Sequence, residues 1–329
     1  MKNHAFIFSA FFILSAFLPL PEFVNHPGRQ SAAPAPRHLE EIAYDNRRNV
    51  LYLFGGAELR DKSWKEPDDF FEFAGAWKNR TENGPCGRRG HAMVYDLASD
   101  ELVVIGGVTT TASGSDSLLF DTWIWSEKRW MLVDTKCPVK EGRAVYNTET
   151  KSILLYGDSH DLSKPWNGGD VRTFELWEFR NRRWTKLSDK GPSDGPFPLA
   201  YNQAVKSLAL LEWRNDGLIL WEWKSKEWIK KEFKSNFPHA RAKYAFAYSS
   251  FSKALFVFAG IDSNKNLLGD FWMYDGTRWK ELTLDTTPSP RASLRLIDGG
   301  DRLLLYGGLK QGGLTNELWE FKDNRWKKL

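Results

Sequence analysis

Five pairs of tryptophans with a fixed spacing constrain the fold of this 329-residue chain more than any other feature. In each pair the second tryptophan follows the first by seven residues. The pairs are Trp123 and Trp130, Trp177 and Trp184, Trp221 and Trp228, Trp272 and Trp279, and Trp319 and Trp326. Because the chain holds only 16 tryptophans, this regularity is not a product of chance. The sequence therefore predicts a tandem repeat.

Two further landmarks keep step with the pairs. Before each pair, an aromatic or aliphatic residue is followed by a small polar one: Tyr95-Asp96, Tyr146-Asn147, Tyr201-Asn202, Tyr248-Ser249 and Ile297-Asp298. Between the landmarks lies an apolar run that usually ends in glycine, as in LVVIGG at residues 102–107. An earlier copy, with Tyr44-Asp45, LYLFGG at residues 51–56 and Trp77, brings the copies to six. A period near 50 residues with strand-like content is typical of a propeller blade.

Each repeat predicts four strands. In the second repeat they are HAMVYD (91–96), ELVVIGG (101–107), DTWIW (121–125) and RWMLV (129–133). The unbroken apolar run of the second strand favours burial on both faces. We therefore expect an all-β, six-bladed propeller with four antiparallel strands per blade over residues 36–329. The expected blades are 36–84, 85–138, 139–192, 193–236, 237–287 and 288–329.

The repeat also predicts how the blades pack. Each paired tryptophan is interpreted as a wedge between blades, since aromatic rings bury large areas. Blades one and six are each contiguous in sequence, so we expect the ring to close by packing, without a shared strand. Repeat four has Leu211-Glu212 where a glycine pair is expected, and repeat three has Gly157-Asp158. Blade four should be the irregular one.

The order of strand, glycine pair, third-strand aromatic and tryptophan resembles the kelch repeat, over nearly all of residues 36–329. Kelch-like propellers include a copper-dependent oxidase of galactose, whose central domain has this architecture, and exported sialic acid epimerases. The resemblance thus implies an alternative function as such an enzyme, although no segment of this chain matches the catalytic segments of the epimerases. Independently of the resemblance, Glu40 and Glu41 on the first strand are candidates for an acid or base at the channel; the alternative is that one of them faces water there and is inert. The histidines lack metal-ligand spacing, so we expect no metal and no cofactor: His38, His91, His160 and His239 lie in four different repeats.

The first 21 residues read as a secretory signal peptide or an N-terminal anchor. Lys2 and His4 precede an apolar stretch at residues 5–20, which is shorter than most membrane spans. Residues 22–35 look like a linker. We therefore expect export to the periplasm, the cell surface or the medium. No membrane insertion is expected beyond that N-terminal segment.

Export makes Cys86 and Cys137 candidates for a disulfide. They occupy equivalent positions in neighbouring repeats, however, and bonded cysteines need Cα atoms within about 7 Å. Both alternatives, a bridge and two separate thiols, stay open. The net charge of +4 is spread among both signs rather than collected in runs, which gives little support to nucleic-acid binding.

Long links between the second and third strands should share one face with the links between blades, and binding usually resides on such loops. The expected links are residues 57–69, 108–120, 159–173 and 261–269. Three tryptophans outside the repeat pattern fall in or beside them: Trp64, Trp166 and Trp213. Four arginines recur near the start of the first strand: Arg37, Arg88, Arg241 and Arg291. They either attract an anionic ligand at the channel mouth or pair with loop carboxylates inside the repeat.

These features favour an exported, monomeric, non-catalytic module that binds a protein or a glycan through the loop-rich face. The alternatives are a carbohydrate-active enzyme of the sugar oxidase or sialic acid epimerase type, and a structural module of a larger surface assembly.

Overall fold

The computed structural model describes residues 33–159, 173–192, 198–214 and 217–329. They belong to one compact unit that runs from Ala32 to Leu329. Every regular element within the described residues is a β-strand. None of them is a helix that could cross a bilayer.

Six four-stranded antiparallel sheets form this unit, and each takes its strands from one contiguous stretch of chain. The first sheet holds β1 (Glu41–Asp45), β2 (Val50–Phe54), β5 (Phe70–Phe73) and β6 (Trp77–Asn79). The second holds β7 (Ala92–Asp96), β8 (Glu101–Ile105), β11 (Thr122–Ser126) and β12 (Arg129–Asp134). The third holds β13 (Val139–Asn147), β14 (Ser152–Ser159), β15 (Thr173–Arg180) and β16 (Arg183–Ser188).

The other three sheets repeat this order. The fourth holds β17 (Leu199–Asn202), β18 (Ser207–Arg214), β19 (Gly217–Lys224) and β20 (Glu227–Phe233). The fifth holds β21 (Ala245–Ser249), β22 (Ala254–Ile261), β23 (Leu267–Tyr274) and β24 (Trp279–Glu281). The sixth holds β26 (Arg295–Asp298), β27 (Leu303–Tyr306), β30 (Leu318–Lys322) and β31 (Arg325–Lys328).

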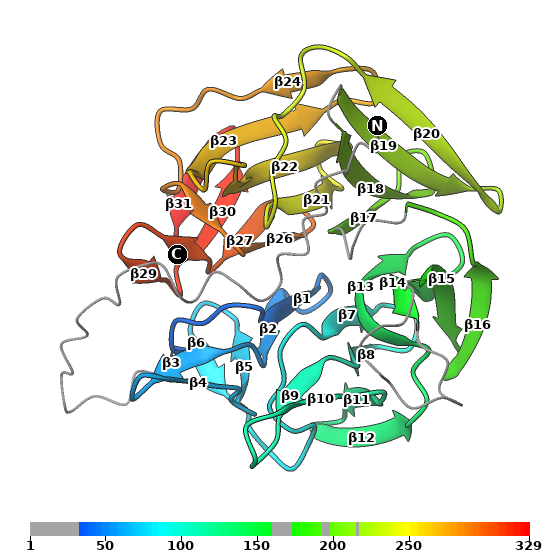
Figure 1. The fold of residues 1–329 in the computed structure, drawn as a ribbon, viewed down its shortest axis with the longest axis vertical. Helices are drawn as coiled ribbons and strands as arrows, with labels where there is room; N and C mark the ends of the chain where they lie inside the picture. Colours follow the sequence, from blue (N-terminus) through cyan, green and yellow to red (C-terminus); the bar gives the residue numbers. More distant parts are fainter. Residues whose placement is uncertain (1–32, 160–172, 193–197, 215–216) are drawn as a thin grey trace, which may run out of the picture. The chain divides into compact units, whose positions relative to one another are not determined.

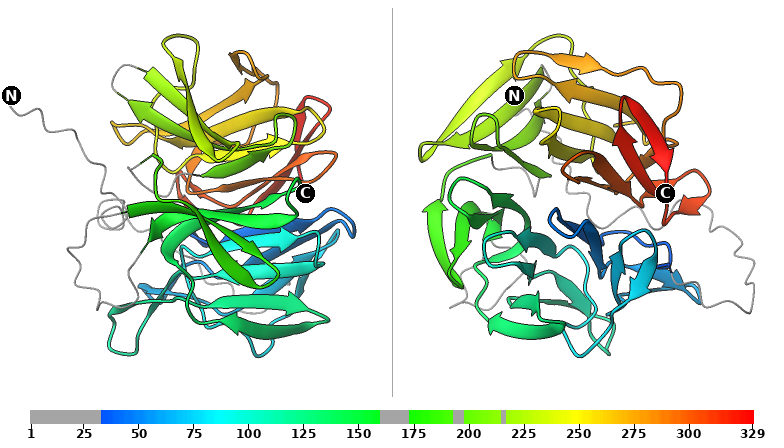
Figure 2. Two further views of the ribbon diagram at one scale, coloured as in Figure 1. Left: turned by 90° about the vertical axis from the view of Figure 1, so that its right-hand side faces the viewer. Right: turned by 180° about the vertical axis from the view of Figure 1, so that it is seen from behind.

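The first strand of each sheet is the innermost, and these strands close a ring (Figures 1 and 2). Each contacts the next in the order β1, β7, β13, β17, β21 and β26, and β26 contacts β1. Sheets one and six meet there without exchanging a strand. The predicted all-β propeller and its mode of closure are confirmed.

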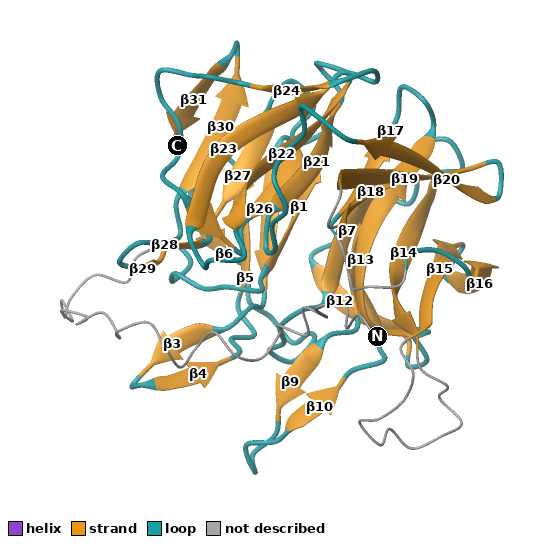
Figure 3. Ribbon diagram, turned by 45° about the horizontal axis from the view of Figure 1, so that its top comes forward, coloured by secondary structure: helices purple, strands orange, loops and turns teal. Residues whose placement is uncertain are grey.

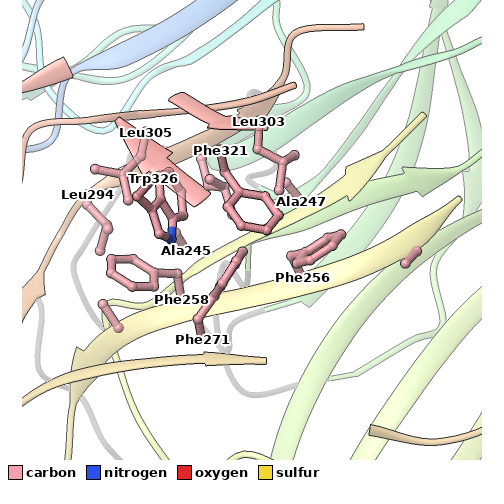
Figure 4. Packing of buried hydrophobic residues seen from close by; sticks show 13 residues of the cluster. Ala245, Ala247, Phe256, Phe258, Phe271, Leu294, Leu303, Leu305, Phe321 and Trp326 are labelled. Carbon is pink, nitrogen blue, oxygen red and sulfur yellow. The ribbon is translucent and has the colours of Figure 1, made fainter. Parts of the chain in front are cut away.

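The core is divided among the junctions between neighbouring sheets. Six apolar clusters occur, and each draws its residues from two adjacent sheets. In the cluster of Figure 4, Trp326 of the sixth sheet lies 5.6 Å from Phe258 and 5.2 Å from Phe271 of the fifth, between ring centroids. The second tryptophan of a pair is therefore a wedge between blades, as the repeat predicts.

In the first, second and sixth sheets the second strand ends at the glycine pair. Both glycines of these pairs have positive φ, which other residues rarely adopt: 65° and 92° at Gly55 and Gly56 in the first sheet. A Cβ on Gly56 would also lie 2.8 Å from that of Glu40. The glycines thus allow the chain to leave the sheet beside the innermost strand.

Sheets three and four depart from this pattern, whereas we expected the irregularity in blade four. Strands β14 and β18 each run for eight residues through the positions of the glycine pair and stay in register with the third strand there. Strand β22 of sheet five also runs through them, but with a register shift between Phe258 and Gly260. Register also corrects the alignment of repeat four. Leu208 pairs with Tyr201 as Leu51 pairs with Tyr44, so Glu212 and Trp213 occupy the glycine positions.

Three smaller sheets lie between second and third strands or beside them. They are the hairpin of β3 (Glu58–Arg60) and β4 (Ser63–Lys65), the hairpin of β9 (Val108–Thr110) and β10 (Asp116–Leu118), and a sheet of β25 (Arg291–Ala292), β28 (Leu309–Lys310) and β29 (Gly313–Leu314). The β3–β4 and β9–β10 hairpins project from the same end of the sheets (Figure 3). This end is the predicted loop-rich face.

Candidate functional site

The four repeated arginines are buried, and each forms an ion pair with a carboxylate that lies just before the third strand or, in the fifth sheet, within it. The pairs are Arg37 with Asp69, Arg88 with Asp121, Arg241 with Asp270, and Arg291 with Glu317, at 2.5, 2.6, 2.6 and 2.8 Å. The same guanidiniums donate to the carbonyls of Gly55, Gly106, Ala259 and Gly307. Of the two alternatives for these arginines, the structure shows pairing inside the repeat.

Three of these four carboxylates, those of Asp121, Asp270 and Glu317, also accept a hydrogen bond from the first tryptophan of the pair in their repeat. The indole Nε1 of Trp123, for example, donates to Asp121 at 2.7 Å, and that of Trp272 donates to Asp270 at 2.7 Å. The repeat therefore contains a buried chain of carbonyl, arginine, carboxylate and indole. Its members are mutually satisfied, as buried polar groups must be.

Two of the three unpaired tryptophans are described, and they differ in environment. Trp64 lies on β4 with 39% of its surface exposed, and its ring centroid is 4.6 Å from that of His38. Trp213 lies within β18 and packs against the core, with Nε1 donating to the Pro238 carbonyl at 2.8 Å. Trp166 falls outside the described residues. Of the two described, only Trp64 is presented to solvent.

Both cysteines are free thiols, so the candidate disulfide is absent. Cys86 is exposed, whereas Cys137 is buried and donates to the Val139 carbonyl at 3.3 Å. Burial raises the pKa of Cys137 to about 12. Equivalent positions in neighbouring repeats thus hold two chemically different thiols.

A second set of charges gathers at the start of the innermost strands. Arg295 of β26 forms an ion pair with Glu41 of β1. Its Nε lies 3.0 Å from Oε2 of Glu41, and its Nη2 lies 2.9 Å from Oε1. Nη1 of Arg143, on β13, lies 3.5 Å from the same Oε1. Three blades therefore contribute to one ion cluster on the channel axis. The side chains of Arg143 and Arg295 keep 17% and 16% of their surface exposed.

His38 extends this cluster toward the loop-rich face. Burial, followed by the charges of Lys243, Arg89 and Arg295, lowers the pKa of His38 to about 4. The imidazole is therefore neutral at pH 7, beside three cations. Lys243 is partly buried, which lowers its pKa, and within the described residues it has no ion pair.

Arg89 ties the two projecting hairpins together. Its guanidinium pairs with Glu66, which follows β4, and with Asp116 of β10 at 2.6 Å. The Thr110 hydroxyl of β9 donates to the same Glu66 carboxylate at 3.0 Å. The hairpin that carries Trp64 is therefore braced against its neighbour.

The sequence reasoning missed Arg143, Arg295 and Lys243 as site residues. Glu41, Arg143 and Arg295 share one register position, because each pairs with the last residue before the first glycine position: Phe54, Tyr156 and Tyr306. The second and fifth sheets place Ala92 and Ala245 there. An alignment of the repeats shows charged residues at a position that holds alanine in the second and fifth repeats. This difference is the sequence signal by which the site residues can be found.

Glu40 and Glu41, the predicted acid or base candidates, are enclosed. Glu40 has no exposed surface and neither of its oxygens is hydrogen-bonded; burial raises its pKa to about 7. Glu41 is 7% exposed and held by the two guanidiniums. Among the described side chains, no group of three or more His, Cys, Asp or Glu could hold a metal ion.

A polar hollow of about 590 Å³ lies away from this cluster. It is lined by Asp68, Thr81, Glu82, Asn83, Arg129 and Trp130. Gly84 packs closely against Trp130, because a Cβ on this glycine would lie only 2.3 Å from the indole. The hollow therefore sits between the first two blades.

Comparisons with known proteins agree with this architecture. Residues 212–329 match the model of the kelch-repeats domain of KLHDC2, KLHL20 and DRC7. The solved structure of YjhT resembles this one with a TM-score of 0.64 and 14% sequence identity, covering 90% of this chain and 98% of YjhT. At that identity the likeness concerns the fold alone. A comparison with curated proteins finds no match. The described part of the chain therefore has the fold of a β-propeller, and residues 212–329 resemble a kelch-repeats domain.

Proposed function

We propose that this protein is an exported, non-catalytic module that binds a protein or a glycan through its loop-rich face. The observation that carries the proposal is the exposed Trp64 on a braced hairpin beside the ion cluster of the channel mouth. Exposed tryptophan next to charged groups is typical of binding hot spots.

The bracing matters because a rigid loop loses little entropy when a ligand binds. Glu66 follows directly on β4 and is fixed by Arg89 and by Thr110. His38 supports the indole of Trp64 from the side of the innermost strand. Trp64 is thus held in place before any ligand arrives.

The alternative of a sugar-modifying enzyme is less well supported. A catalytic acid or base must reach the substrate within hydrogen-bond distance. Glu40 is wholly buried and Glu41 is engaged by two arginines. Binding is therefore the function that the geometry supports best.

The export part of the proposal is carried by residues 1–21, with their basic start and apolar core. Expression of the full chain followed by cell fractionation tests it. We expect the protein outside the cytoplasm. Retention in the cytoplasm would contradict export without affecting the binding proposal.

The binding part is tested by screening the purified full chain against an array of defined glycans and a displayed peptide library. Hits are then measured with Trp64→Ala and with Phe251→Ala. Phe251 is a matched control, because it is also 39% exposed but lies in the turn between β21 and β22, on the opposite face. We expect Trp64→Ala to weaken binding by about tenfold or more and Phe251→Ala to leave it unchanged. Equal effects of the two changes would contradict the proposal.

A further inference from the structure

The outer strands of five blades are short or irregular, whereas that of blade four is neither. Strands β6, β24 and β31 have three, three and four residues. Strands β12 and β16 are longer, but their pairing with the third strand shifts register. Strand β20 keeps all seven residues in register with β19. Short length and bulges protect free strand edges from pairing with other chains, so β20 lacks the protection that the other outer strands have.

The far edge of β20 is unpaired in the described part of the molecule. There β20 is the last strand of its sheet and pairs with β19 alone (Figure 1). The turn between these strands has two residues, both with positive φ, so the residues that flank it, Lys224 and Glu227, form a hydrogen-bonded pair. Backbone groups alternate along a strand, and those of Trp228, Lys230 and Glu232 therefore point away from β19. These three residues offer their N–H and C=O groups to a further strand.

We infer that the free edge of β20 pairs with the same edge of a second copy of this chain, antiparallel and with Ile229 opposite Ile229. Two four-stranded sheets then join into one of eight strands. A two-fold axis uses both free edges, so assembly stops at two copies. Whereas the sequence predicts a monomer, this edge favours a dimer. The interface belongs to blade four and Trp64 to blade one, so the inference goes beyond the proposed function and does not depend on it.

The charges along β20 favour this register. With Ile229 at the centre, two pairs of opposite charge face each other, and the two-fold axis repeats them: Glu227 with Lys231 and Lys226 with Glu232. Opposite charges stabilise an antiparallel strand pair, whereas like charges destabilise it. A centre at Lys230 or at Lys231 would place lysine opposite lysine. Among these three registers, the charges therefore select the one centred on Ile229.

The side chains at the centre of the strand are presented to solvent. Ile229 is 44% exposed, and its copy in the partner would cover it. Glu227 is exposed and has no ion pair within the described residues. Lys231 pairs with Glu222 at 2.8 Å but keeps 41% of its side chain exposed. Both members of the central charge pair are therefore within reach of a second strand.

The pairing also sets the orientation of the two propellers. Strand β20 begins at the tight turn that follows β19 and ends toward the loop-rich face. An antiparallel partner strand runs the other way. The dimer therefore presents its two loop-rich faces in opposite directions, and both stay open to ligands.

Sedimentation velocity of the full chain tests the inference. One strand pair buries less than the roughly 1,600 Å² of a standard interface, so we expect dimers at about 100 µM and monomers at about 1 µM. Lys230→Pro removes an outward N–H without touching the ladder to β19, and it should keep the chain monomeric throughout. Thermal melting verifies that this variant folds. A wild-type chain that stays monomeric at about 100 µM overturns the inference, as does a dimer that survives Lys230→Pro.

Two charge reversals test the register. Glu227→Lys and Lys231→Glu each place like charges opposite each other, so each variant alone should dimerise about tenfold or more weakly. An equimolar mixture of the two restores both opposite pairs and should dimerise as the wild type does. Lys280→Glu is the matched control and should change nothing, because Lys280 is an exposed cation on β24, the outer strand of the next blade. A mixture that stays monomeric, or dimers indifferent to both reversals, overturns the inference.

The remaining occupant of this edge is a foreign strand. If the chain stays monomeric and a peptide from the screen loses affinity in Lys230→Pro, the edge belongs to another protein and the inference is wrong. The proposed function is judged separately, by the dependence of ligands on Trp64.

Discussion

Blades one, two, five and six differ from blades three and four at the point where the second strand meets the loop-rich face. In the first group a buried arginine donates to the carbonyl at the first position of the glycine pair, as Arg88 does to Gly106 at 2.9 Å. In the second group the strand continues in register with the third strand, where Gly157 and Glu212 pair with Glu175 and Ile219. Strand β22 of blade five also continues, but its register shifts between Phe258 and Gly260, so Ala259 leaves the ladder. Blade three has the apolar Val139 at the arginine position.

The buried arginine supplies a hydrogen-bond donor that the sheet no longer provides. A buried carbonyl must have a donor, and a strand that leaves the ladder loses the one that the sheet supplies. The arginine replaces that donor. Where β14 and β18 stay in the ladder, no arginine is needed. The carboxylate-to-indole bond persists without it, from Trp177 to Glu175 and from Trp221 to Glu212.

In blades three and four the cation that pairs with this carboxylate lies at the surface. Lys186 of β16 pairs with Glu175 at 2.5 Å, and Arg214 of β18 pairs with Glu212 at 2.5 Å. These side chains are 44% and 54% exposed, whereas Arg88 is fully buried. The carboxylate thus has a buried cationic partner in one group of blades and an exposed one in the other.

The largest effect is expected from the wedge tryptophans. Trp130 of blade two lies 5.0 Å from Phe70 of blade one between ring centroids and is 8% exposed, so Trp130→Ala should lower the free energy of unfolding by about 3–5 kcal/mol. Trp184 of blade three is only partly buried, so Trp184→Ala should cost less. Urea denaturation measures both, and equal losses would contradict the difference between the junctions.

Arg88→Ala should have an effect nearly as large. It leaves the Gly106 carbonyl and the Asp121 carboxylate without their partner, and removal of one member of a buried pair costs about 3–5 kcal/mol. The same denaturation experiment checks it. A loss below about 1 kcal/mol would show that the arginine does not support the turn.

The closing junction should make stability depend on pH. Glu40 of blade one is buried, and blade three has Gly142 at the same position of its innermost strand. Burial raises the pKa of Glu40 from 4.5 to about 7. The folded state therefore favours the protonated carboxyl, and its stabilising contribution is present below pH 4.5 and lost as the pH rises through 7. The change amounts to about 3 kcal/mol.

Glu40→Gln should make the free energy of unfolding less dependent on pH between pH 4.5 and 7. Glu227→Gln, a change at an exposed residue, should leave the pH dependence as it is. Denaturation midpoints measured from pH 4 to pH 8 check this. A profile unaltered by Glu40→Gln would place the pH dependence elsewhere.

The smallest effect is expected from Lys186→Ala, the exposed counterpart of Arg88→Ala. Ion pairs that solvent reaches contribute about 0–1 kcal/mol, and Trp177 continues to donate to Glu175 at 2.9 Å. A loss as large as that of Arg88→Ala would remove the distinction between the two groups of blades.

Much of this fold follows from sequence because its repeat is local. The pairs such as Trp123 and Trp130 lie on adjacent strands, and the seven-residue spacing is that of a tight turn between them. The partners of the repeated arginines also lie within the same repeat, as Asp69 does for Arg37. Pairing with loop carboxylates was accordingly one of the two alternatives that the sequence offered.

The channel mouth follows from sequence much less directly. Glu41 meets Arg295 only because the last blade closes on the first, across almost the whole chain. Arg143 reaches the same carboxylate from blade three, which is adjacent neither to blade one nor to blade six. Trp213 could not be told from Trp64 by pattern, because its indole is satisfied by a carbonyl 25 residues away, that of Pro238.

The proposed binding of a protein or a glycan through the loop-rich face depends on Trp64. Titration of the ¹⁵N-labelled full chain with the tightest-binding hit of the glycan and peptide screen, observed at the indole N–H signals and assigned with Trp64→Phe, tests it most directly. We predict that the Trp64 signal shifts while those of the wedge tryptophans, such as Trp130 and Trp326, stay in place. Shifts confined to other indoles, with the Trp64 signal unmoved, would contradict the account.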